Sequence, residues 1–187
     1  MQLALTPDGR WDFATSDVVS AASAAGFTAK VPPQHIQRCA KLFDDVGAGI
    51  AVEYTPLGAI PSIRDGMDVV RPASRAGRAG LMIDSWHYCF SDNTWDDLAA
   101  VPLDDIAYLQ FTDALEPEHR ERMIRESLHR RALPGEGILE LHRFAATFLD
   151  RGYDGTVSVE VLSAELRKLP VDVLTGRLYP TTAPYWS

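Results

Sequence analysis

Cysteine is scarce in this sequence, and long apolar runs are absent. The two cysteines, Cys39 and Cys89, form no Cys-x-x-Cys pair, and their positions on an expected helix and just after an expected strand favour two buried free thiols over a disulfide. No apolar stretch approaches the roughly 20 residues that cross a bilayer. The first residues have neither the basic segment nor the apolar run of a signal peptide. We therefore expect a cytoplasmic protein that has no membrane partner.

Positive charge is also in short supply. Lysine and arginine number 18 against 26 aspartates and glutamates, which gives a net charge of −8 and argues against a nucleic-acid partner. The phosphate-binding motifs G-x-G-x-x-G and G-x-x-x-x-G-K-[ST] do not occur, and the G-x-S-x-G nucleophile elbow is absent as well. The 187 residues are enough for one sizeable core and short for two domains. We expect a single domain over residues 1–187.

Short apolar segments alternate with helical patterns along the chain. Strands are expected at residues 2–6, 50–53, 80–84, 106–111 and 156–161. Helical periodicity or capping signals lie at residues 16–26, 34–46, 63–73, 94–100, 116–131 and 138–150, and in a tail that breaks at Pro170. This alternation predicts repeated right-handed βα units. Because a closed eight-stranded barrel typically needs about 250 residues, we predict an α/β fold that is a shortened TIM-barrel-like (β/α) structure, with about five parallel strands and the helices outside.

Polar residues at the strand ends carry the strongest functional signal. Four consecutive expected strands end in or near Glu53, Asp84, Gln110 and Glu160. The carboxyl ends of parallel strands meet at one rim, where α/β proteins place their chemistry. Such oxygen donors suit Mg²⁺ or Mn²⁺, with Co²⁺ and Zn²⁺ as alternatives, and facing carboxylates repel one another unless a cation or protons compensate. The pattern predicts a divalent metal site; the competing interpretation is four separate solvated or helix-capping side chains.

Two basic side chains are candidates for catalysis. His87 comes three residues after Asp84 and can face the same rim as a general acid or base; the alternative is a histidine packed beside its aromatic neighbours. The guanidinium of Arg131 can hold a substrate carboxylate or oxyanion through two hydrogen bonds. The alternative interpretation is that Arg131 is one of the solvated charged side chains of a segment that begins near Glu116. Asp113 is expected only to cap the loop after its strand.

Five segments in a fixed order resemble a known family: AVEYTP, GLMIDSWH, IAYLQFTDA, RRALPGEGILEL and GYDGTVSVEVLS. They are similar to the second half of the xylose isomerase-like TIM barrels, the sugar phosphate isomerase/epimerase superfamily, which includes inosose dehydratases and 3-dehydroshikimate dehydratases. The resemblance covers residues 50 to about 180, with the first strand and helix. It implies one divalent metal held by Glu53, Asp84, Gln110 and Glu160, and substrate contacts from His87, a candidate acid/base, and Arg131. The glutamine is more similar to the dehydroshikimate dehydratase-like branch than to the epimerases.

The chain departs from this family in length. The second to fourth strands and their helices are missing, which places an expected deletion near residues 27–34. Because the first and fifth strands would then have exposed edges, we expect a homo-oligomer, for example a dimer that completes the barrel.

The resemblance implies a metal-dependent isomerase, epimerase or dehydratase for a small sugar-like or cyclic carboxylated substrate. The alternative is a catalytically degenerate barrel fragment that serves as a binding or assembly partner. A DNA-repair endonuclease of the same fold would need a histidine-rich metal site and a basic face, which five scattered histidines and the net charge of −8 do not favour.

Overall fold

The computed structural model describes residues 33–187. The strand expected at residues 2–6, the helix expected at residues 16–26 and most of the expected deletion at residues 27–34 lie outside these described residues. Within residues 33–187, no helix combines the length and the apolar character that crossing a membrane requires.

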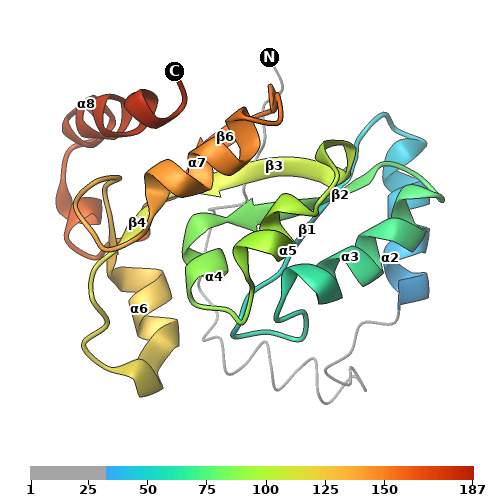
Figure 1. Cartoon of the computed structure of the whole chain (residues 1–187), viewed down its shortest axis with the longest axis horizontal. Helices are drawn as coiled ribbons and strands as arrows, with labels where there is room; N and C mark the ends of the chain where they lie inside the picture. Colours follow the sequence, from blue (N-terminus) through green and yellow to red (C-terminus); the bar gives the residue numbers. More distant parts are fainter. Residues whose placement is uncertain (1–32) are drawn as a thin grey trace. The chain divides into compact units, whose positions relative to one another are not determined.

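Four strands form one parallel sheet in the order β1-β2-β3-β6 (Figure 1). They are β1 (Ile50–Glu53), β2 (Ala79–Asp84), β3 (Ile106–Phe111) and β6 (Val157–Val159). The predictions for β1, β2 and β3 are confirmed. The strand predicted at residues 156–161 is shorter, so that Glu160 follows the strand instead of lying in it, although its N–H still donates to the carbonyl of Phe111 at 3.3 Å.

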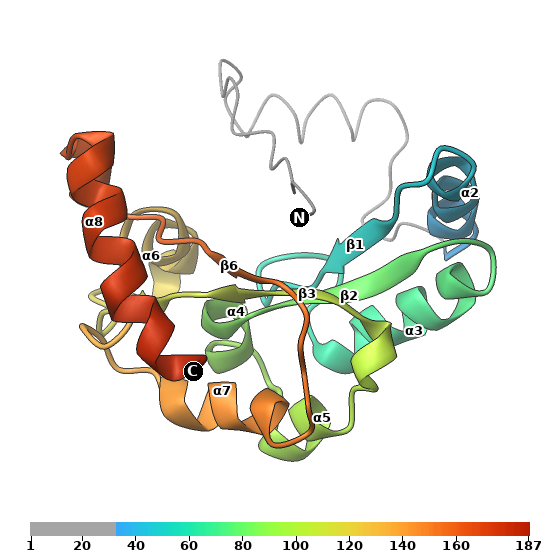
Figure 2. The same ribbon diagram turned by 90° about the horizontal axis from the view of Figure 1, so that it is seen from above.

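Helices and turns connect the strands. The longer helices are α2 (Pro33–Asp44), α3 (Ile63–Ser74), α7 (Leu141–Leu149) and α8 (Val171–Thr182). The shorter ones are α4 (Ser85–Cys89), α5 (Trp95–Ala99) and α6 (Met123–His129), and 3₁₀ turns lie at Leu103–Asp105, Arg120–Arg122, Leu166–Lys168 and Ala183–Tyr185. Figure 2 shows α3, α4, α5 and α7 on one side of the sheet.

Local sequence signals explain where several helices begin. The hydroxyl of Thr94 accepts from the N–H of Asp97, whose carboxylate accepts in return from the N–H of Thr94, and this capping box starts α5 as predicted. Ser62 caps α3, because its hydroxyl accepts from the N–H of Asp65. Pro170 precedes α8, where the tail was predicted to break.

The prediction of a helix over residues 116–131 is wrong at both ends of the segment. Only the turn Arg120–Arg122 and α6 are helical there, and Arg131 lies in a short strand, β5 (Arg131–Ala132). β5 pairs antiparallel with β4 (Asp113–Ala114), and the N–H of Arg131 donates to the carbonyl of Leu162 at 3.1 Å. These partners from distant parts of the chain hold Arg131 extended, which a helical pattern of charges does not reveal.

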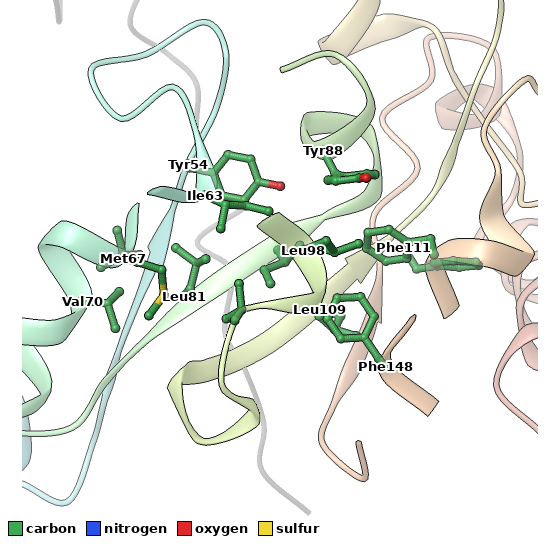
Figure 3. Packing of buried hydrophobic residues seen from close by; sticks show 14 of the residues in the cluster. Tyr54, Ile63, Met67, Val70, Leu81, Tyr88, Leu98, Leu109, Phe111 and Phe148 are labelled. Atoms are coloured by element: carbon green, nitrogen blue, oxygen red, sulfur yellow. The ribbon is translucent and has the colours of Figure 1, made fainter. Parts of the chain in front are cut away.

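The two faces of the sheet differ in chemistry. On one face, buried apolar side chains pack against the helices (Figure 3), among them Val52, Leu81, Ile83, Leu109 and Phe111 from the strands and Met67, Val70, Phe144 and Phe148 from α3 and α7. Side chains alternate along a strand, so Glu53, Asp84 and Gln110 lie on the other face. Burial of each large apolar side chain stabilises the fold by about 1.5–3 kcal/mol.

Both cysteines are free, but the prediction that they are buried is wrong: Cys39 and Cys89 are exposed. In α2, the residue that packs inward is the next one, Ala40, which is fully buried. Cys89 is the last residue of α4, one position beyond the buried Tyr88.

Three hydroxyl and backbone contacts fix the polar edge of the sheet. The hydroxyl of Ser85 donates to the carbonyl of Thr112 at 2.8 Å and accepts from its N–H at 3.0 Å. The hydroxyl of Thr112 donates to the carbonyl of Ala132 at 3.2 Å. Since these bonds join the segments that follow β2 and β3 to β5, they fix the position of Arg131 relative to Asp84.

The carboxylate of Asp113 organises the loop that follows β5. It is buried and accepts backbone N–H groups from Ala114 at 2.8 Å and from Gly135, Gly137 and Leu139 at 3.0 Å each. A Cβ at Gly137 would collide with this carboxylate. Asp113 was expected to cap the loop after its own strand, but apart from the N–H of Ala114 its carboxylate binds a loop 22 to 26 residues further along the chain. The bonds to Leu139 and its neighbours also explain why α7 begins at Leu141 and not near residue 138.

We predict that Asp113→Ala lowers the free energy of unfolding by about 3 kcal/mol, because it leaves several backbone N–H groups without an acceptor. Urea denaturation measures the change. The control is Asp68→Ala, which removes an exposed carboxylate from α3 and should alter stability by no more than about 0.5 kcal/mol. Equal losses in the two variants would contradict the role assigned to Asp113.

Candidate active site

Asp84 is the fixed point of the candidate site. It is the last residue of β2 and the N-cap of α4, and its side chain is fully buried. One carboxylate oxygen, Oδ1, accepts the N–H groups of Trp86 at 2.6 Å and of His87 at 3.4 Å. The strand and the helix turn therefore hold the carboxylate rigidly, and the same turn brings His87 back toward the sheet.

His87 pairs with the carboxylate at the end of β1. Its Nε2 lies 3.1 Å from Oε1 of Glu53; the His87 side chain is 7% exposed and that of Glu53 is 43% exposed. The imidazole also meets the Trp86 ring edge-on, with 5.3 Å between centroids. One ligand atom from each of Glu53, Asp84 and His87 lies within 4.8 Å of the others, a spacing that could hold a metal ion.

Arg131 is buried in the site and does not belong to a solvated charge run. Its Nη1 lies 2.6 Å from Oδ2 of Asp84 and 3.2 Å from Oε2 of Glu160. Its Nε donates to the carbonyl of Ser127 at 2.9 Å, and its guanidinium carbon lies 5.5 Å from the centre of the Trp86 ring. The guanidinium thus joins two carboxylates that the sequence predicted as metal ligands.

Gln110 is the fourth predicted ligand. It pairs with Asp84 in the β2–β3 ladder, and its side chain is 4% exposed. Its Oε1 is buried, and no residue in the described part of the chain donates a hydrogen bond to it. Because an unsatisfied buried carbonyl oxygen is costly, this atom is suited to accept from a ligand or to coordinate a cation.

The electrostatics of the site reflect burial and crowded negative charge. Burial raises the pKa of Glu160 above its ordinary value, Asp84 and Glu53 raise it further, and Arg131 opposes the shift. Burial also raises the pKa of Tyr108, to which the negative charges of Glu53, Glu160 and Asp84 contribute. Sequence reasoning missed Tyr108, although the two-residue period of a strand places it on the same face as Gln110.

A cavity of about 290 Å³ opens beside these groups. Its lining combines charged and polar side chains with apolar ones: Glu53, Thr55, His87, Ser127, Arg131 and Glu160 with Leu57, Ile124, Leu128 and Leu162. The polar residues come from β1 and the segment after it, α4, α6, β5 and the segment after β6, and α6 also supplies part of the apolar wall. A cavity of this size and mixed lining suits a small polar molecule that has an apolar face.

The donor set fits a hard divalent cation. Three carboxylates and an amide oxygen without a partner are the ligand types that Mg²⁺ and Mn²⁺ prefer. Glu53, Asp84 and His87 form the tight group, whereas Glu160 reaches Asp84 through Arg131. The parts played by Glu53, Asp84, Gln110, Glu160, His87 and Arg131 stay predictions.

A parallel sheet with polar residues at its carboxyl edge and helices on one side defines a (β/α)-barrel type of protein. A sequence model of the family described as xylose isomerase-like TIM barrel matches residues 33–175. The chain belongs to this family, which confirms the resemblance seen in its sequence.

Two bacterial enzymes are similar to this chain. A 3-dehydroshikimate dehydratase of Pseudomonas aeruginosa is 34% identical over 117 residues, which are 60% of this chain and 18% of that protein. A 3-dehydroshikimate dehydratase of Pseudomonas putida is 30% identical over 91 residues, which are 49% of this chain and 14% of that protein. The chain therefore spans less than a fifth of the length of these relatives.

Solved structures agree with the fold. A xylose isomerase domain protein from Salmonella typhimurium matches with a TM-score of 0.71 and 14% identity, over 92% of this chain and 68% of that one. The IolI protein, whose crystal structure holds a zinc atom, matches with a TM-score of 0.69 and 20% identity, over 84% and 59%. A D-psicose 3-epimerase matches at 0.60 and 15% identity, over 81% and 53%.

We predict that the stability contribution of Glu160 depends on pH. Its pKa in the folded chain is raised above the ordinary 4.5, so its contribution is fully present below pH 4.5 and is lost as the pH rises through the raised value. Relative to Glu160→Gln, which stays neutral, the native protein should lose stability as the pH rises from 4.5 to neutrality. Urea denaturation at a series of pH values measures this difference; a native protein that gains stability relative to Glu160→Gln as the pH rises would contradict the burial argument.

Proposed function

We propose that the chain carries the metal and substrate site of a metal-dependent isomerase, epimerase or dehydratase, and that dehydration of a small cyclic hydroxylated carboxylate is its reaction. The single observation that carries the proposal is the convergence of Glu53, Asp84, Gln110, His87 and Arg131 at one edge of the sheet. Both named relatives are dehydratases, and this favours dehydration over epimerisation.

The proposed ligands of a divalent metal are Glu53, Asp84, Gln110 and Glu160. When bound, Mg²⁺ or Mn²⁺ would polarise a carbonyl oxygen and stabilise the negative charge that develops on it. The chain's own contribution is the placement of Glu53, Asp84 and Gln110 at the ends of strands that the sheet holds in register, with Glu160 directly after β6.

His87 moves the proton in this proposal. Imidazole is the most common general acid and base of enzymes, and His87 lines the cavity beside Glu53, whose Oε1 orients the ring through Nε2. In a dehydration, His87 takes the proton from the carbon next to the carbonyl and returns a proton to the departing hydroxyl group, which leaves as water. Arg131 orients the carboxylate of the substrate.

The apolar residues of the cavity complete the proposed substrate site. Leu57, Ile124 and Leu128 line it together with the charged groups and can cover the ring face of a cyclic substrate. This apolar contact excludes water from one side of the ring.

We predict that Asp84→Asn and Glu53→Gln each weaken Mn²⁺ binding at least about tenfold, because each removes a carboxylate ligand. Isothermal titration measures the affinity. Ultraviolet absorbance of a 3-dehydroshikimate reaction mixture follows dehydratase turnover, and chromatographic separation of the sugars in a D-fructose reaction mixture follows epimerase turnover. Glu165→Gln is the control, since Glu165 is exposed and pairs only with Lys168 among the described residues. Native Mn²⁺ affinity in both site variants would refute the proposed ligands.

We predict that His87→Gln lowers kcat about 100-fold or more while leaving the Mn²⁺ dissociation constant unchanged. His142→Gln changes an exposed histidine and should preserve both values. A parallel loss of metal affinity in His87→Gln would instead make His87 a ligand, as its distance from Glu53 and Asp84 allows.

One observation favours a second candidate function. The described residues form four parallel strands, whereas a closed barrel of this type has eight. We propose as the alternative a barrel fragment without turnover that serves as a binding or assembly partner, in keeping with the oligomer expected from the sequence. Two results together would favour this alternative. The protein would bind the metal without converting either substrate, and it would elute on size-exclusion chromatography as an assembly with a second polypeptide chain.

A further inference from the structure

Arg131 occupies a position that the proposed metal also needs. Its Nη1 lies 2.6 Å from Oδ2 of Asp84 and 3.2 Å from Oε2 of Glu160. Both carboxylates belong to the proposed ligand set. A guanidinium and a divalent cation cannot both sit against the same oxygens without strong repulsion.

The hydrogen bonds of Asp84 sharpen this conflict. Its Oδ1 already accepts two backbone N–H groups, from Trp86 and His87. Oδ2 is therefore the oxygen best able to take a further strong partner, and Arg131 takes it. Since Asp84 is fully buried, water does not weaken the attraction between this carboxylate and whichever cation holds it.

The rest of the guanidinium is anchored independently of the carboxylates. Nε donates to the carbonyl of Ser127 at 2.9 Å, Nη2 lies 3.4 Å from its hydroxyl oxygen, and the Trp86 ring lies 5.5 Å from the guanidinium carbon. Nη1 also donates to the carbonyl of Glu160 at 3.4 Å. Loss of its two carboxylate contacts would thus leave Arg131 in the wall of the cavity, with Nη1 able to donate to another anion.

We propose that Arg131 is an internal cation that competes with the divalent metal for Oδ2 of Asp84 and Oε2 of Glu160. Metal binding transfers these oxygens to the metal and releases Nη1 of Arg131 to the carboxylate of the substrate. Arg131 therefore sets the metal affinity of the site and makes the anion site available only when the metal is bound. The inference rests on the metal site of the proposed function and not on turnover.

The test compares Mn²⁺ binding in the native chain, Arg131→Met and Arg131→Lys by isothermal titration, with melting temperatures measured with and without Mn²⁺. Arg130→Met is the matched control. Arg130 is the neighbouring residue, but it pairs with Glu118 at 2.7 Å and Glu126 at 2.8 Å, away from the cluster.

We expect Arg131→Met to bind Mn²⁺ about tenfold more tightly, the factor that corresponds to one charge-assisted hydrogen bond of about 1.4 kcal/mol. Its metal-free form should melt below the native protein, because the carboxylates lose their cation, and Mn²⁺ should raise its melting temperature more than it raises the native one. Arg130→Met should keep the native affinity.

Folding of Arg131→Met only with Mn²⁺ would also support the inference. If this variant does not fold at all, Arg131→Lys decides. Lysine is one bond shorter than arginine and has no Nε or Nη2 to bond Ser127, so its ammonium group holds the two carboxylates less firmly and this variant should bind Mn²⁺ more tightly than the native chain. Equal or weaker Mn²⁺ binding in the folded Arg131 variants overturns the inference and leaves the metal site standing. No Mn²⁺ binding in any variant overturns both.

Discussion

The contact between Asp84 and Arg131 determines the arrangement of the other polar groups. A fully buried carboxylate is costly unless hydrogen bonds and an opposite charge satisfy it, and Asp84 has both. Its position follows from the strand and helix that meet there. The position of Arg131 depends on a strand pair about which α/β folds have no general rule. The bonds of Ser85 and Thr112 couple the two residues, so the polar edge forms one connected unit.

The part of the site that lies on the sheet was predictable from sequence. Glu53, Asp84 and Gln110 lie at or near the ends of apolar strands. Because side chains alternate along a strand and the carboxyl ends of parallel strands share one edge, their common position follows from the sequence pattern. Arg131 was assigned to the end of a helix because its neighbours are charged at helical spacing, and only tertiary hydrogen bonds make it extended. The partners of Arg131 could not be predicted, since the contact with Asp84 joins residues far apart in the chain.

Membership of the family accounts for the polar residues at the strand ends, but not for the small number of strands in the described residues. The proposed metal ligands and acid/base group come from the strands and loops that this chain contains, and Glu53, His87, Arg131 and Glu160 line one cavity. A cavity lined by both charged and apolar side chains is suited to a substrate with polar and apolar parts. Metal, proton transfer and anion recognition would then meet within one short edge of the sheet, with Arg131 belonging to both the ion network and the substrate wall.

The bonds between the carboxylate of Asp113 and the backbone N–H groups of residues 135–139 have a consequence for how this loop can change during evolution. The carboxylate recognises backbone N–H groups, not side chains, so the loop keeps its path whatever side chains it displays, provided that glycine stays at positions 135 and 137, where the backbone φ of +89° and the close carboxylate demand it. Glu136, which is exposed, is thereby free to vary. Exposed side chains of this loop can therefore change without disturbing the strand that carries Arg131.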